Sequence, residues 1–123
     1  MKPFQAALRF VLEILSLTVY ALWGYDSVAE PGTKAVLLAL ALPVAFATLW
    51  GVFAVPDDPS RSGKTVVRTP GWLRFLLEIA LLGAAAWMLL DLGHRQLALL
   101  FAAALLFHYS ASGKRLRWLL SQK

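Results

Sequence analysis

Two short segments of this sequence place an arginine and a glutamate four residues apart within apolar surroundings. Residues 8–14 read LRFVLEI and residues 73–79 read LRFLLEI, which is identity at six of seven positions with an offset of 65 residues. On a helix, a spacing of four puts both charges on one face, where a guanidinium can pair with a carboxylate. The chemistry open to them is ion pairing, or the binding or relay of a proton or cation by the carboxylate.

The four charged residues are Arg9, Glu13, Arg74 and Glu78. Counted from Phe4 at about 1.5 Å per residue, Glu13 lies about 13 to 14 Å along an apolar helix. That depth is close to the middle of a hydrocarbon layer about 30 Å thick. Because charge there is costly, such side chains face the bundle interior and pair. We expect the four to meet, within each helix or crosswise as Arg9 with Glu78 and Arg74 with Glu13.

Two interpretations of this quartet stay open. In the structural interpretation, the ion pairs fix the register of helices that otherwise have weak packing preferences in lipid. In the functional interpretation, a carboxylate binds or relays a proton or cation. Neutralisation by two arginines leaves a carboxylate little tendency to exchange protons, which favours the structural interpretation.

Other residues, near the level of the two arginines, are candidates for an inner cavity, namely Trp50, Gly51, His108 and Tyr109. His108 is either a proton carrier or a polar group satisfied at the inner rim of the bundle. Pro43 lacks an amide hydrogen and is predicted to kink the helix that carries it.

These residues lie in long apolar segments. The chain has 123 residues, of which 59% are hydrophobic and 15% charged, and a mean hydropathy of +0.65. A soluble domain this small could not bury so much apolar surface. The segments are residues 4–24, 35–55, 72–92 and 97–112. A membrane helix needs about 20 residues, which the fourth segment reaches only by continuing into the basic residues that follow it.

The pattern predicts an all-α, four-helix transmembrane bundle that forms one domain over residues 1–123. The repeated charged motif predicts two tandem helical hairpins, at about 4–55 and 72–112, related as a parallel internal repeat. A cleaved signal peptide is the competing interpretation of the first segment. Glu13 within that segment, and the recurrence of its motif far from the N-terminus, argue against cleavage.

Basic residues are unevenly divided between the two sides of such a bundle. The side with fewer holds Lys34 and Arg95. The other side holds ten, which are Lys2, Arg9, Arg61, Lys64, Arg68, Arg74, Lys114, Arg115, Arg117 and Lys123. The positive-inside rule therefore predicts cytoplasmic termini, a cytoplasmic loop at 57–70 and a basic cytoplasmic tail at 114–123. The loop and tail are expected to attract anionic lipid.

Several classes of function find no support in the sequence. There are no cysteines, so disulfides and thiolate chemistry are excluded. No catalytic triad, metal-ligand cluster or water-accessible carboxylate pair is visible, so we expect no enzyme activity, cofactor or metal. The basic residues behind the net charge of +5 lie between the apolar segments, as in a membrane protein. Nucleic acid is therefore not an expected partner.

The chain also resembles the YrdB family of small bacterial membrane proteins, which is defined by a domain of unknown function. The resemblance covers the chain up to about residue 109 and rests on both charged motifs, Trp23-Gly24 and the Leu-Pro and Leu-Trp-Gly-x-Phe-x-x-Pro patterns within residues 42–56. It implies a bacterial plasma-membrane protein of four spans without an established activity. It marks for testing Arg9, Glu13, Trp50, Gly51, Pro56, Arg74 and Glu78.

We therefore expect a non-enzymatic membrane bundle that is structural, accessory or partner-binding, either as a homo-oligomer or with another membrane protein. The alternative is a small oligomeric transporter or channel with Glu13 and Glu78 as proton or cation sites.

Overall fold

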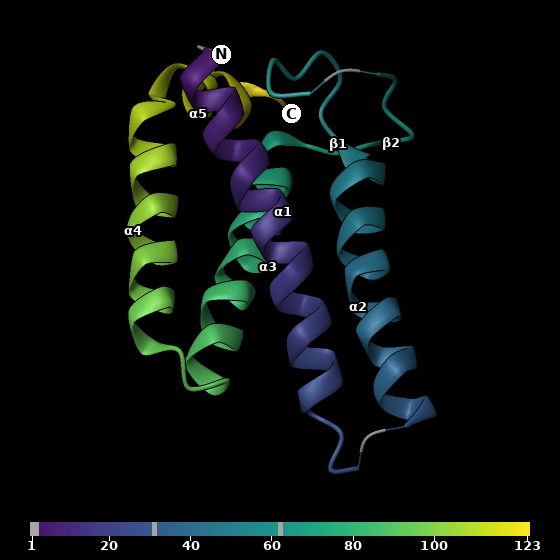
Figure 1. Ribbon diagram of the computed structural model, residues 1–123. Coiled ribbons are helices and arrows are strands. Elements are labelled where there is room, and N and C mark those ends of the chain that lie inside the picture. The colour runs from purple at the N-terminus through teal and green to yellow at the C-terminus, as the bar shows by residue number, and fades with distance from the viewer. Residues whose placement is uncertain (1–2, 31, 62) are drawn as a thin grey trace.

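The computed structural model describes residues 3–30, 32–61 and 63–123. Lys2, counted above among the basic residues, lies outside these ranges. Within them the regular secondary structure is helical apart from one pair of short strands (Figure 1). The helices are α1 (Pro3–Asp26), α2 (Thr33–Val52), α3 (Gly71–Asp91), α4 (Arg95–Ala111) and α5 (Gly113–Ser121). The strands are β1 (Phe53–Ala54) and β2 (Val67–Arg68), which pair in parallel.

Three helices, α1, α2 and α3, are long and apolar enough to cross a membrane. The fourth candidate is α4 together with α5, but the two are bent by 72° at their junction. The predicted fourth segment thus corresponds to α4, and the chain turns sharply before the basic residues instead of continuing straight into them. The all-helical prediction and the presence of several helices suited to a membrane are confirmed.

The second apolar segment ends earlier than predicted. Helix α2 stops at Val52, and Phe53–Ala54 are extended and paired with β2, so residues 53–55 are not helical as the segment 35–55 implied. Pro56 explains this end, because proline has no amide hydrogen and disfavours helical geometry in the residue before it. Pro43 lies inside α2, which is one helix on both sides of it. The expected kink stays a prediction.

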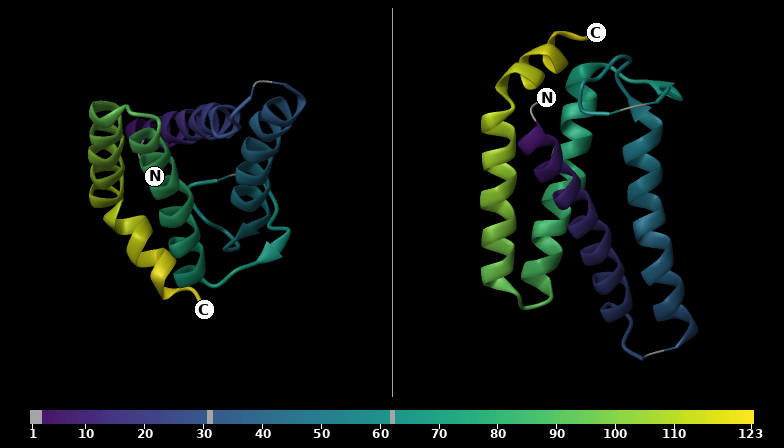
Figure 2. Two further views of the ribbon diagram at one scale, coloured as in Figure 1. Left: turned by 90° about the horizontal axis from the view of Figure 1, so that it is seen from below. Right: turned by 45° about the horizontal axis from the view of Figure 1, so that its top comes forward.

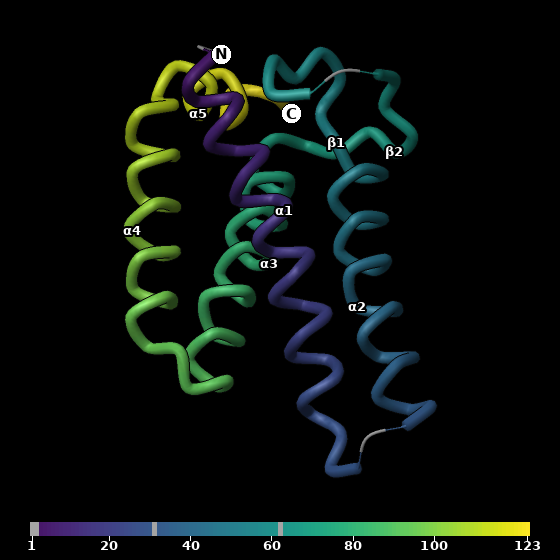
Figure 3. The backbone as a smooth tube through the Cα atoms, viewed as in Figure 1, coloured from purple at the N-terminus to yellow at the C-terminus, as the bar shows by residue number. Residues whose placement is uncertain are grey.

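The helices form two hairpins, α1 with α2 and α3 with α4, and both chain termini lie at the same end (Figures 1 and 2). We call this the terminal end; it also holds α5 and the loop between β1 and β2, as the tube view shows (Figure 3). Helix α1 runs diagonally and contacts α2, α3 and α4. The two connections at the opposite end are short.

Packing at two glycines brings helices unusually close. A Cβ on Gly24 would lie 2.8 Å from the Leu38 carbonyl oxygen, so the backbones of α1 and α2 approach each other closely there. A Cβ on Gly71 would lie 1.5 Å from the Leu119 carbonyl oxygen, where α5 crosses the start of α3. The Gly71 amide also donates to the Gln122 carbonyl at 2.9 Å. These contacts fix α5 across the terminal end.

Large apolar side chains cover the outside of the bundle. Among the described residues of α2, only Ala35 and Phe46 are buried, while Leu40 and Val44 are each 63% exposed. An apolar surface of this extent would be unstable in water, which is typical of helices that face lipid or a partner.

Candidate functional site, a buried charge cluster at the terminal end

Glu78 on α3 is the centre of a buried charge cluster. Its carboxylate accepts two hydrogen bonds from Arg9 on α1 at 3.2 and 2.9 Å, and one from Arg74, a turn earlier on α3, at 2.8 Å. It accepts two more from Arg115 on α5 at 3.1 and 2.8 Å and one from the Tyr109 hydroxyl on α4 at 2.5 Å. A carboxylate offers about four lone-pair positions, so these donors saturate it.

The pairing of the four charged motif residues is part local and part crosswise. Arg74 and Glu78 pair within α3, and Arg9 and Glu13 approach each other within α1, with Nε to Oε1 at 3.5 Å. Arg9 also pairs crosswise with Glu78 at 2.9 Å. The structure therefore brings the quartet together, with Glu78 as the shared acceptor.

Arg74 turns away from Glu13 and contacts the end of α2 instead. Its Nη1 donates to the carbonyl oxygens of Trp50 at 2.6 Å and Phe53 at 2.5 Å. Carbonyls at the C-terminal end of a helix have no partner within that helix, and a cation there is favourable. The expected crosswise pair of Arg74 with Glu13 is replaced by this contact.

Trp50 on α2 lies at the level of the arginines, as its position in the sequence predicts. The guanidinium carbons of Arg9 and Arg74 are each 4.8 Å from the centroid of its ring, which is cation–π geometry. Its indole Nε1 donates to Glu13 at 2.9 Å, and Phe46 stacks on its ring with centroids 5.3 Å apart. Trp50 thus joins α2 to both charged motifs.

The cluster includes an ion pair that was not among the sequence candidates. Arg115 donates from Nε to Asp58 at 2.9 Å and from Nη2 at 2.7 Å, and both side chains are buried. Burial by itself would raise the pKa of Asp58. The hydrogen bonds and charge of Arg115 outweigh it, helped by the Ser60 amide, and hold that pKa below its usual value.

In the sequence, Asp58 and Arg115 belong to the polar loop and the basic tail, where charges are normally solvated. One signal could have singled out Arg115. It lies 65 residues after Trp50, the same offset that separates Glu13 from Glu78. Trp50 donates to Glu13 as Arg115 donates to Glu78.

The two glutamates differ in their access to solvent. The side chain of Glu78 is 0% exposed, whereas that of Glu13 is 27% exposed. His108 is buried beside the cluster, with Nε2 3.5 Å from Arg9 Nη1, and its Nδ1 contacts no polar partner among the described residues. The structure therefore gives His108 only a weak polar contact.

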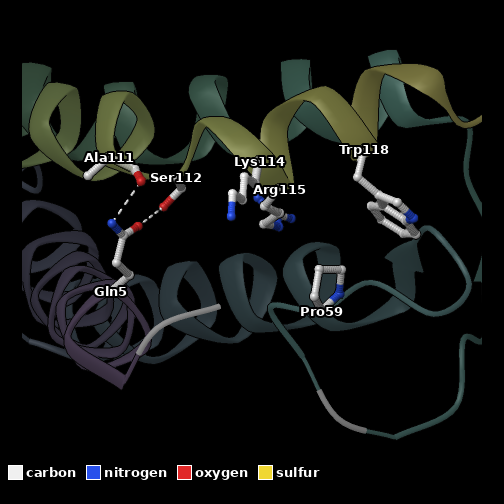
Figure 4. A pocket seen from close by; sticks show the side chains of 7 residues that line it. All are labelled: Gln5, Pro59, Ala111, Ser112, Lys114, Arg115 and Trp118. Carbon is white, nitrogen blue, oxygen red and sulfur yellow. Dashed lines mark hydrogen bonds between the residues drawn. The ribbon is translucent and has the colours of Figure 1, made fainter.

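The larger of two cavities that border the cluster lies between the start of α1, the α4–α5 junction and the loop, with a volume of about 620 Å³ (Figure 4). Gln5 crosses one side of it, donating to the Ala111 carbonyl at 2.8 Å and accepting from the Ser112 hydroxyl. The rest is lined by Pro59 of the loop and by Lys114, Arg115 and Trp118 of α5. Its chemistry is basic and amphipathic.

A smaller cavity of about 340 Å³ lies beside Trp50 on the other side of the cluster. Residues from α1, α2, the loop and α3 line it, including Arg9, Glu13, Gly51, Ser60, Arg61 and Arg74. Glu13, which is partly exposed, is among the residues that line this cavity. Within residues 3–30, 32–61 and 63–123, no three histidine, aspartate or glutamate side chains gather closely enough to hold a metal.

Comparisons with known proteins agree with the resemblance noted from the motifs. A family model described as a protein of unknown function, DUF2568, matches residues 7–106. The chain is 38% identical over 118 residues to the uncharacterised protein YrdB of Bacillus subtilis (strain 168), covering 94% of this chain and 92% of that protein. No solved structure matches the chain. The matched region contains both charged motifs. The chain therefore belongs to the DUF2568 family of proteins of unknown function.

Proposed function

We propose that this protein is a non-enzymatic accessory protein of the bacterial plasma membrane, with four spans built from two tandem hairpins. The terminal end would face the cytoplasm. The positions of the exposed basic residues support this orientation, because Lys64, Arg68 and Lys114 lie at the terminal end and Lys34 and Arg95 at the opposite end. Trp50 and Arg115 are 65 residues apart and donate to Glu13 and Glu78 respectively, which supports a duplicated hairpin.

The observation that carries the proposal is the saturated carboxylate of Glu78. Donors from α1, α3, α4 and α5 meet on it, so one buried group holds both hairpins and the tail in a single arrangement. Removing one partner of a buried ion pair costs about 3 to 5 kcal/mol, because the remaining charges lose their compensation. A group with such a role stabilises a rigid bundle, and its acceptor positions are already occupied.

An accessory protein needs a surface for its partner. The exposed apolar face of α2 is suited to a second copy of this chain or to another membrane protein, since helices in lipid associate by close packing. Exposed Lys114 and Arg117 on α5 are suited to anionic lipid at the cytoplasmic surface.

The test is to compare the wild type with Glu78→Gln and Glu13→Gln in proteoliposomes, measuring proton and cation flux and thermal stability. We expect no flux from any of the three and a large loss of stability in Glu78→Gln alone, because Glu13 is partly exposed and has fewer partners. Flux in the wild type that disappears in Glu13→Gln without a loss of stability would overturn the accessory role and establish transport.

A further inference from the structure

One cationic side chain beside the smaller cavity has unused hydrogen-bonding capacity. Arg61 donates from Nη2 to the Gly51 carbonyl at 3.1 Å, but its Nη1 is buried and bonds to no described residue. The hydroxyl oxygen of the adjacent Ser60 is also buried without a partner among the described residues. A buried donor left unsatisfied costs about 1 to 3 kcal/mol, and more when charged. An acceptor that reached both would be strongly favoured.

The charges around the cavity favour an anion. The cluster balances three arginines, Arg9, Arg74 and Arg115, against three carboxylates, Glu13, Asp58 and Glu78. Arg61 forms no ion pair with any described residue and adds one positive charge to a balanced group. A partly enclosed site with a surplus guanidinium attracts negative charge more strongly than the same group in water.

We infer that this cavity binds a phosphate group, with Arg61 and Ser60 as its recognition residues. The planar guanidinium fork suits phosphate oxygens, and both Arg61 and Ser60 line the cavity. The volume of about 340 Å³ is at the lower end of small-molecule sites, which run from about 300 Å³. The phosphate is either inorganic phosphate or that of a phospholipid headgroup, and the lipid source rests on the proposed membrane orientation.

The larger cavity is a weaker site despite its size. Its polar groups are already paired, Gln5 with Ser112 and Arg115 with Asp58 and Glu78. Lys114 alone remains to recognise an anion there, and it is exposed. A ligand in this cavity would have to break existing hydrogen bonds, whereas a phosphate beside Arg61 would complete unfilled ones.

The experiment uses the full chain in nanodiscs at constant ionic strength. In phosphatidylcholine nanodiscs, inorganic phosphate is titrated by calorimetry. In a second arm, the rise in Tm is measured when phosphatidic acid replaces part of the phosphatidylcholine. We expect Arg61→Gln to weaken phosphate binding by about tenfold or more, because a charge-assisted hydrogen bond is lost. Ser60→Ala should weaken it less, and Glu13→Gln, which removes a neighbouring negative charge, should strengthen it.

Arg68→Gln is the matched control, because it removes the same charge from the neighbouring strand β2, at an exposed position that does not line the cavity. Phosphate binding with this pattern of variants supports the site and a soluble ligand. If only phosphatidic acid gives a response, as a rise in Tm that changes among the variants in the same order, the site is supported with a lipid ligand. No response in either arm, or equal losses in Arg61→Gln and Arg68→Gln, would overturn the site. Ion flux is measured in a separate experiment, so the accessory role and the phosphate site can each fail without the other.

Discussion

Asp58 and Arg115 form an ion pair that joins the polar loop and the basic tail to the bundle. Asp58 lies in the loop after β1 and Arg115 on α5, and their side chains are 0% and 3% exposed. Arg115 also reaches Glu78, so the loop carboxylate and the α3 carboxylate share one guanidinium. At the residue scale, the stability of the terminal end therefore depends on Asp58 being ionised.

This dependence predicts an acid-sensitive step in stability. The pKa of Asp58 is lower in the folded protein than its ordinary value of 3.8. The stabilisation is complete above that ordinary value, decreases as pH falls below it, and is lost once pH passes the folded pKa. Between about pH 5 and about pH 3, the wild type should therefore lose more stability than Asp58→Asn, which lacks this carboxyl group. Thermal unfolding in nanodiscs across this range measures the difference.

Asp57→Asn is the control for that experiment. Asp57 is the exposed neighbour of Asp58 and has a φ of 65°, a conformation that asparagine also adopts. Its pH profile should match that of the wild type. Identical profiles for the wild type and Asp58→Asn would contradict an ionised buried pair with Arg115.

At the scale of elements, the bend after α4 decides the shape of the terminal end. Ser112 lies between α4 and α5, and its hydroxyl is held by Gln5 of α1. Because α5 turns by 72°, its Arg115 and Leu119 face inward and its Arg117 and Leu120 face outward. The crossing of α5 over α3 is possible because Gly71 has no side chain.

We predict that Gly71→Ala displaces α5 from α3, because the added methyl group would overlap the Leu119 carbonyl. Overpacking of this kind costs about 1 to 3 kcal/mol. The measurement is thermal stability together with the rate of proteolysis of residues 113–123. Gly83→Ala on the same helix is the control, since a Cβ there meets nothing within 4 Å. Slow proteolysis of the tail in Gly71→Ala, with unchanged stability, would show that the contact is unimportant.

At the scale of the whole molecule, the uneven charge of the two ends sets the expected orientation. The terminal end carries the loop, α5 and both termini, and the opposite end carries two short connections (Figure 1). Basic segments are retained in the cytoplasm during insertion, so the difference between the ends should fix one orientation.

Single-cysteine variants test this orientation directly, because the chain has no cysteine of its own. In intact bacterial cells, a membrane-impermeant maleimide should label Lys34→Cys and Arg95→Cys at the opposite end. It should label Lys64→Cys and Lys123→Cys only after the cells are opened. Labelling of Lys64→Cys in intact cells would reverse the proposed orientation and would move the predicted phosphate site to the outer surface.

The sequence by itself determined the class of this protein. Long apolar segments indicate membrane helices because the free-energy cost of exposing them to water is proportional to their apolar area. The sequence alone gives that area, since it depends on residue types. The spacing of Arg9 with Glu13 and of Arg74 with Glu78 indicated that charges would meet inside the bundle, because a helix fixes which residues share a face. Family membership followed from the same motifs.

Only the tertiary structure decided which partners those charges take. Glu78 receives Arg9, Arg115 and Tyr109 from three other helices, and such long-range contacts depend on helix tilt and on the bend at Ser112. The structure also separated the two glutamates, one saturated and one beside a cavity, although their local sequences are nearly identical. The physical reason is that spacing along a chain fixes local geometry, whereas burial and charge pairing are set by whichever distant elements pack around each residue.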